Sequence, residues 1–191
     1  MKYLFHFFLV LAVALITGCA SKPREISISL HESWAQPCQI SGVPNCYVLE
    51  PGLYRSAQPT RQGIENLEKM GISNILSLRT TATDNLLASS TMMACHSVPM
   101  DYLKIDEKEV LDAVRIMNTP RYRPLLIHCL HGSDRTGVVC ATYRVLVQGW
   151  TKEEAIAEML EGDFGFHSCF PNIVEFIRNL DVEQARRKLK Q

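Results

Sequence analysis

The sequence has no excess of charge of either sign, because Lys and Arg together number 20 and Asp and Glu together also number 20. Proteins that bind nucleic acid need a basic surplus on at least one face, so this balance argues against such a partner. The chain also lacks internal repeats and low-complexity tracts. Its 191 residues therefore predict one globular domain with a substantial core.

Two further absences bear on function. No group of Cys and His residues has the sequence spacing of metal ligands, so neither a metal nor another cofactor is expected. No apolar run is long enough to cross a bilayer as a conventional helix, since the one near the start spans only Tyr3 to Ile16. A short apolar run after a positive residue is typical of a signal peptide.

That run ends in Leu15-Ile16-Thr17-Gly18-Cys19, which resembles a bacterial lipobox. The resemblance implies that residues 1–18 are removed and that Cys19 is lipidated. The residue directly after Cys19 is Ala20 and not an acidic residue, so the resemblance implies that the signal that retains lipoproteins in the inner membrane is missing. The expected location is the bacterial cell envelope, facing the periplasm and anchored by lipid to the outer membrane. An ordinary signal peptide or an uncleaved anchor remains the alternative.

Seven cysteines are present, and an oxidising compartment permits disulfides between them. Cys38 and Cys46 flank a turn-rich segment that could bring them together. Cys140 lies in a predicted helix, where packing is expected rather than pairing. Residues 19–46 are interpreted as a tether and N-terminal extension, and residues 47–191 as the catalytic domain.

Strand and helix patterns alternate along that domain, which predicts an α/β fold. We expect a central, mostly parallel sheet of about four to five strands flanked by helices. Expected strands are two short ones around the Pro51-Gly52 turn, Ile72–Arg79, His96–Met100 and the run that starts at Pro124. Expected helices are Thr60–Met70, Glu107–Asn118, Thr136 to about Gln148, one after Thr151, and a last one from Pro171.

The most informative stretch runs from Pro124 to Gly137, where an apolar strand, a turn-rich loop and a helix follow one another. Backbone N–H groups that curl round such a loop, together with a helix N-terminus, form an anion site. Arg135 adds a planar two-pronged donor that suits phosphate oxygens. Cys129 stands at the base of the loop, where the same positive field stabilises a thiolate nucleophile.

The order His128, Cys129, five residues, Arg135, Thr136 resembles the signature of the cysteine-dependent protein tyrosine phosphatases. An early stretch, Tyr54-Arg55-Ser56-Ala57-Gln58-Pro59, is similar to one in their compact dual-specificity branch. The resemblance implies that Cys129 forms a phosphocysteine, that Thr136 assists the departure of the sulfur, and that His128 orders the loop. It also implies that the loop binds the phosphate group through Leu130, His131, Gly132, Ser133, Asp134 and Arg135.

The leaving oxygen needs a proton from a carboxylic acid on another loop. The family places an aspartate on a loop before the cysteine, and Asp101 and Asp106 both fall near that place, with Asp84 further away. Asp106 can serve as a helix N-cap, whereas Asp101 has no evident structural role. Asp101 is therefore the predicted acid, although the spacing alone leaves Asp106 open.

The expected activity is hydrolysis of phosphate monoesters, foremost phosphotyrosine and then phosphoserine or phosphothreonine on proteins. Asp134 places a negative side chain at the rim of the loop, which disfavours very highly charged substrates. An inositol phosphate or another small phosphorylated substrate, a non-catalytic phosphoprotein-binding module and a sulfurtransferase remain alternatives. Arg55, Arg79 and His167 could also reach the rim of the pocket. The oligomeric state is left open.

Overall fold

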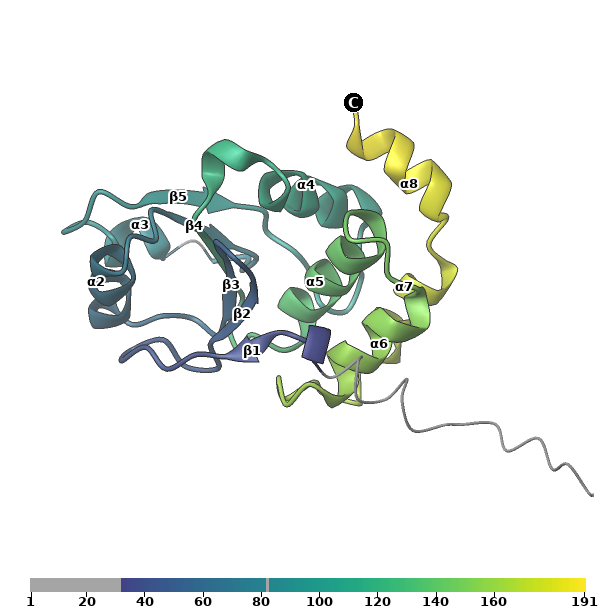
Figure 1. Cartoon of the computed structure of the whole chain (residues 1–191), viewed down its shortest axis with the longest axis horizontal. Coiled ribbons are helices and arrows are strands. Elements are labelled where there is room, and N and C mark those ends of the chain that lie inside the picture. The colour runs from purple at the N-terminus through teal and green to yellow at the C-terminus, as the bar shows by residue number, and fades with distance from the viewer. Residues whose placement is uncertain (1–31, 82) are drawn as a thin grey trace, which may run out of the picture.

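A computed structural model describes residues 32–81 and 83–191, and Figure 1 shows that a central sheet lies between two groups of helices. The strands are β1 (Gln36–Pro37), β2 (Tyr47–Glu50), β3 (Leu53–Ser56), β4 (Asn74–Ser77), β5 (Ala94–Ser97) and β6 (Leu125–His128). The helices are α2 (Arg61–Lys69), α3 (Asp84–Leu87), α4 (Glu107–Met117), η1 (Pro120–Tyr122), α5 (Asp134–Leu146), α6 (Lys152–Glu161), α7 (Pro171–Asn179) and α8 (Val182–Leu189). The predicted α/β class is confirmed.

The sheet has the strand order β1-β2-β3-β6-β4-β5. Strands β3, β6, β4 and β5 run parallel to one another, whereas β2 pairs antiparallel with both β1 and β3. The sheet therefore has one strand more than the upper limit expected from the sequence. The additional strand is the two-residue β1, which falls in the segment interpreted as a tether.

Strand β6 lies between β3 and β4, with His128 in register with Ser56 on one side and Ser77 on the other. Its side chains alternate between the two faces of the sheet. Leu125 and Ile127 join the core formed with α4 to α8, and Leu126 joins the core formed with α2 and α3. Because helices cover both faces of the sheet (Figure 1), the side chains on both sides of β6 are apolar, and its sequence is a continuous apolar run.

Three helices begin as their capping residues predict. Thr60 Oγ1 accepts from Gly63 N, and Asp106 accepts from the backbone N–H groups of residues 108 and 109. Thr151 and Glu154 form the complete capping box before α6. These local hydrogen bonds fix where each helix starts, independently of its distant partners.

Several boundaries differ from the sequence-based expectation, and strand β4 is shorter at both ends than the expected Ile72–Arg79. Strand β5 ends at Ser97, so a three-residue segment separates it from Asp101. Helix α5 begins at Asp134, two residues before the expected start. The helix from Pro171 is not the last one, because the backbone at Leu180 turns extended (ψ 124°) and Asp181 caps a separate helix, α8, by accepting from Gln184 N.

The cysteines lie as the sequence indicated. The Sγ atoms of Cys38 and Cys46 are 2.6 Å apart, and Cys38 N donates to Cys46 O. Cys140 is buried within α5, and burial raises the pKa of its thiol to about 11. Proximity of the first pair and packing of the third residue are therefore confirmed.

In the part of the chain that the structure describes, no helix is both long and apolar enough to span a bilayer. The predicted signal peptide, residues 1–18, and the predicted lipidation site, Cys19, lie outside the described residues. Both stay predictions.

Candidate active site

The candidate nucleophile, Cys129, directly follows β6 at the carboxyl edge of the sheet, which is where parallel α/β sheets bind ligands. The residue is only 2% exposed, and its Sγ accepts a hydrogen bond from Gly132 N at 3.2 Å. The N–H group of Gly132 thus points at the sulfur of the candidate nucleophile. The loop then enters α5 at Asp134, so the N-terminus of a long buried helix points at the same place.

The early stretch around Arg55 supports this loop from below. Buried Arg55 donates from Nη2 to Gly132 O at 2.7 Å, and its guanidinium stacks 3.7 Å from the centroid of the Phe164 ring. Gln58 N donates to Leu130 O at 3.1 Å. Gly132 has a φ of +76°, and a Cβ there would lie 2.5 Å from the backbone carbon of Ser56. The loop therefore needs both glycine at 132 and the strand β3 beside it.

His128 fixes the loop from behind, as the resemblance implied. Its Nδ1 lies 3.0 Å from Cys129 O, and its Nε2 lies 3.1 Å from Asp84 Oδ1. Burial alone would raise the pKa of Asp84, but hydrogen bonds and charge from His128, with help from Gln58 and Ser77, lower that pKa to about 2. Asp84 is only 3% exposed, so its role is to hold His128.

Two of the three side chains considered for the pocket rim have structural partners instead. Arg55 lies under the loop, as described above, and Arg79 donates from Nη1 to Gln58 Oε1 at 2.8 Å. Gln58 in turn donates to Asp84 Oδ1 at 2.8 Å. The early stretch and the acidic residue on α3 thus form one supporting network behind the loop.

The outer side of the loop is held by the segment that follows α6. Ser133 Oγ donates to Phe164 O at 2.7 Å. Asn45 Nδ2 donates to both His131 O at 2.8 Å and Phe164 O at 2.9 Å. Asn45 therefore connects the N-terminal part of the described chain to the catalytic loop, a role that no local pattern around it indicates.

Arg135 and Thr136 stand at the start of α5. The guanidinium of Arg135 lies 5.6 Å from the centroid of the Tyr102 ring, and its Nη1 is 3.4 Å from Met100 O. Thr136 Oγ1 is buried and has no hydrogen-bond partner within the described residues. It does not cap α5, whose N-cap is Ser133. The hydroxyl is therefore free to interact with sulfur or with a bound group.

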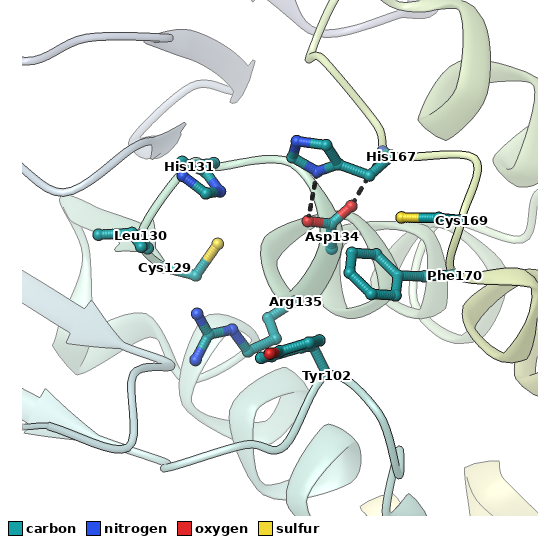
Figure 2. Close-up of a pocket in the computed structure, with 9 residues that line it drawn as sticks. All are labelled: Tyr102, Cys129, Leu130, His131, Asp134, Arg135, His167, Cys169 and Phe170. Carbon is teal, nitrogen blue, oxygen red and sulfur yellow. Dashed lines mark hydrogen bonds and ion pairs between the residues drawn. The ribbon is translucent and has the colours of Figure 1, made fainter.

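A cavity of about 250 Å³ opens above the nucleophile (Figure 2). Its lining residues are Tyr102, Cys129, Leu130, His131, Asp134, Arg135, His167, Cys169 and Phe170. Tyr102 and Phe170 form an aromatic side, with ring centroids 5.1 Å apart. Figure 2 shows these two rings on the same side of the cavity as Arg135. Tyr102, Cys169 and Phe170 come from loops far from the signature, so sequence spacing could not identify them.

Asp134 lines the cavity, but its side chain is held by a partner and does not project freely. The residue is 7% exposed. Its Oδ2 lies 2.8 Å from His167 Nδ1, and its Oδ1 accepts from His167 N at 3.1 Å. The carboxylate is therefore held in a compact pair with His167, which is the one of the three proposed rim residues that lines the cavity.

The three aspartates considered as the acid lie in different environments. Asp106 caps α4 and Asp84 is buried behind the loop. Asp101 is exposed, and its Oδ1 accepts from Leu103 N at 2.8 Å. It stands in the chain between Met100, whose carbonyl faces Arg135, and Tyr102, which lines the cavity. Asp101 is thus flanked in the chain by two residues of the site, on an irregular segment.

Comparison with known proteins places this site in context. The sequence pattern of the tyrosine phosphatase family matches residues 43–191. The dual specificity protein phosphatase TpbA of Pseudomonas aeruginosa is 32% identical over 174 residues, which cover 91% of this chain and 78% of that protein. The inositol diphosphatase DSP5 of Arabidopsis thaliana is 28% identical over 127 residues, which cover 60% of each chain.

Solved structures show the same likeness. The crystal structure of P. aeruginosa TpbA aligns with a TM-score of 0.74 and 32% identity, over 83% of this chain and 98% of that chain. A crystal structure of a cysteine-to-serine variant of TpbA in complex with phosphotyrosine aligns with the same TM-score, over 83% of this chain and 97% of that chain.

Proposed function

The chain belongs to the tyrosine phosphatase family, and from this membership we propose that it removes phosphate from phosphotyrosine on proteins by way of a phosphocysteine. It is a cysteine-dependent phosphatase of the dual-specificity type, similar to TpbA over most of its length. Phosphoserine and phosphothreonine are the secondary substrates. Its partner is then a phosphorylated protein.

One observation carries the choice of substrate. The cavity above Cys129 is walled by the rings of Tyr102 and Phe170, and no lysine is found among the described residues that line it. An aromatic wall packs well against the ring of an aryl phosphate. A single guanidinium, that of Arg135, suits one phosphate group rather than several. The crystal structure of a TpbA variant with phosphotyrosine supports the same choice.

In the proposed mechanism, the thiolate of Cys129 attacks phosphorus, and the bond between phosphorus and the phenolic oxygen breaks. The loop N–H groups and Arg135 hold the equatorial phosphate oxygens, where charge is concentrated in the transition state. Asp101 donates a proton to the leaving phenolate, after its loop brings the carboxylate over the cavity. Water then attacks phosphorus and gives its proton to Asp101, and the sulfur departs as a thiolate that the Thr136 hydroxyl stabilises.

The proposal is tested with a panel of phosphotyrosine, phosphoserine and phosphothreonine peptides of matched sequence, with inositol phosphates as a further arm. We expect kcat/KM to be highest for phosphotyrosine and turnover to persist in the presence of chelator, since the nucleophile is a protein side chain. Peroxide should inactivate the enzyme by oxidising the thiolate. Preferred turnover of a multiply phosphorylated inositol would contradict the choice of substrate.

The inositol alternative has one observation in its favour, namely the similarity to a plant protein named as an inositol diphosphatase. That similarity covers only 60% of each chain. A substrate with several phosphate groups needs several cations, and Asp134 adds a carboxylate to the cavity instead. The chemistry of the pocket therefore favours a substrate with one phosphate group.

We further propose that the enzyme is a periplasm-facing lipoprotein anchored through Cys19, because the first residues resemble a signal peptide with a lipobox. The test follows the distribution of the full chain between membrane and soluble fractions. Cys19→Ser should release the protein from the membrane fraction or leave it unprocessed. Unchanged membrane association with normal processing would show that lipidation of Cys19 does not anchor it.

A further inference from the structure

Three side chains with metal-binding chemistry meet at the mouth of the cavity, although they are separated in the sequence. They are His131 in the catalytic loop, Asp134 at the start of α5 and His167 in the segment after α6. One candidate ligand atom from each lies within 4.8 Å of those of the other two. Figure 2 shows His131 and His167 on the same side of the cavity, with Asp134 next to His167.

The surrounding structure holds the backbone of His131 and the pair formed by Asp134 and His167 in place. Asn45 fixes the carbonyl of His131, and the N–H group of His167 donates to Asp134. The rings of His131 and His167 have centroids 5.4 Å apart and are tilted by 59°. The fold therefore brings the two imidazoles and the carboxylate near one another, with the His131 ring left exposed.

The donor set is the one that borderline divalent ions prefer. Two histidines and one carboxylate hold Zn²⁺ in catalytic sites, where the fourth position stays open to water or a ligand. Ligand atoms around a tetrahedral Zn²⁺ lie roughly 3.4 Å apart, given bonds of about 2.1 Å. His167 and Asp134 already approach to 2.8 Å. His131 is exposed, so a change of its rotamer can complete the set.

We propose that His131, Asp134 and His167 form a binding site for Zn²⁺ or a similar divalent transition-metal ion, and that an ion bound there inhibits the enzyme reversibly. Each of the three lines the cavity that holds Cys129 and Arg135, so the ion would occupy space that the substrate needs. It would also replace the contact between Asp134 Oδ2 and His167 Nδ1. This inference goes beyond the proposed function, and only its inhibitory part rests on that function.

Binding is measured directly on the purified, metal-depleted full chain by titration with Zn²⁺, and by the visible absorption of Co²⁺ as a spectroscopic substitute. We expect one ion per chain. His131→Asn and His167→Asn each remove a direct ligand of the ion. Loss of a residue that only supports a ligand weakens metal binding by about 10- to 100-fold, so each of these variants should weaken it by more than that. His96→Asn, on β5 and hydrogen-bonded to Asn74, is the matched control and should bind as wild type does.

The main competing site is the thiolate of Cys129, which is also a zinc ligand by its chemistry. Cys129→Ser should keep Zn²⁺ binding and the Co²⁺ spectrum without a sulfur-to-metal charge-transfer band. Loss of binding in Cys129→Ser with binding retained in both histidine variants would overturn the proposal, as would absence of binding to the wild-type chain. Circular dichroism of each variant verifies the fold.

The inhibitory part is measured as the Zn²⁺ concentration that halves each variant's own metal-free rate. That concentration should rise in the two histidine variants in parallel with the loss of binding, and it should not change in His96→Asn. Zn²⁺ binding without any effect on turnover of an aryl phosphate would overturn the inhibitory part alone. A wild-type chain with no phosphatase activity would contradict the proposed function but would leave the binding result to stand.

Discussion

At the scale of single residues, the chemistry rests on Cys129 and Arg135, which do different things to a bound oxyanion. Cys129→Ser should abolish turnover because a hydroxyl is a far weaker nucleophile than a thiolate. Binding of an inorganic oxyanion such as tungstate should persist, since the loop N–H groups and Arg135 remain. Calorimetry and single-turnover kinetics measure the two effects separately.

Arg135→Lys serves as the companion variant. An ammonium group cannot grip two oxygens at once, so both turnover and oxyanion binding should fall. If Cys129→Ser keeps a rate within about tenfold of wild type, which is only about 1.4 kcal/mol in activation free energy, the nucleophilic mechanism is wrong.

The choice between Asp101 and Asp106 also belongs to this scale. Asp101→Asn should slow a phosphotyrosine peptide strongly, within the about 10²–10⁴-fold range of acid catalysis, and an activated aryl phosphate much less. The free energy of unfolding should hardly change, because the Asp101 carboxylate is exposed and accepts a hydrogen bond from the Leu103 N–H group of its own loop. The alkaline limb of the pH–rate profile should flatten as well.

Asp106 is the matched control, because its carboxylate has a structural task that asparagine can also perform. Asp106→Asn should leave rate and stability near wild type, whereas Asp106→Ala should cost about 1 kcal/mol of unfolding free energy. If Asp106→Asn removes the alkaline limb and Asp101→Asn does not, the two assignments must be exchanged.

At the scale of elements, the catalytic loop depends on partners that lie before it in the chain. The turn at Asn45 has a φ of +53°, and its side chain joins two carbonyl groups, one in the loop and one after α6. Asn45→Gly keeps a residue that tolerates this backbone conformation while it removes only the amide. The change therefore isolates the two hydrogen bonds.

We expect Asn45→Gly to lower unfolding free energy by about 1–3 kcal/mol, from two hydrogen bonds and the added freedom of glycine. It should also lower kcat, because the carbonyl of His131 loses its anchor. Chemical denaturation and steady-state kinetics provide the readouts. Gly149→Ala is the control, because residue 149 also has a positive φ and has open space around it. It changes a backbone position far from the loop. An unchanged kcat in Asn45→Gly would show that the loop keeps its shape without this residue.

Elements also show what a sequence can and cannot predict here. The helix starts at Thr60, Asp106 and Thr151 were predictable because a cap is a bond between near neighbours. The split between α7 and α8 was missed, since apolar positions continue across Leu180 and conceal the change of direction. The nucleophile loop was predictable for a similar reason, because its parts are contiguous. The aromatic wall was not, as its rings approach one another only through tertiary packing.

At the scale of the whole molecule, two carboxylates, one buried and one partly buried, connect the stability of the fold to pH. Burial would raise the pKa of Asp84, but contacts to His128, Gln58 and Ser77 outweigh it and bring that pKa to about 2. Glu50 behaves likewise, since hydrogen bonds from Tyr143, Arg123 and Gln148 lower its pKa against the effect of burial. Both groups are thus more acidic in the folded chain than in the unfolded one.

The direction of the pH effect follows from this difference. As the pH falls, the unfolded chain takes up protons on these carboxylates first, so their stabilising contribution is complete above about pH 5 and is lost on the way to about pH 2. The shift of Asp84 from 3.8 to about 2 corresponds to about 2 kcal/mol. Asp84→Asn should therefore be less stable than wild type at neutral pH by roughly that amount, and the difference should shrink toward zero as the pH approaches 2.

Urea unfolding at several pH values measures this difference in unfolding free energy, with Asp101→Asn as the exposed control that should not show this convergence. A constant difference between wild type and Asp84→Asn across the acid range would mean that packing, and not the charge of Asp84, is what the variant loses.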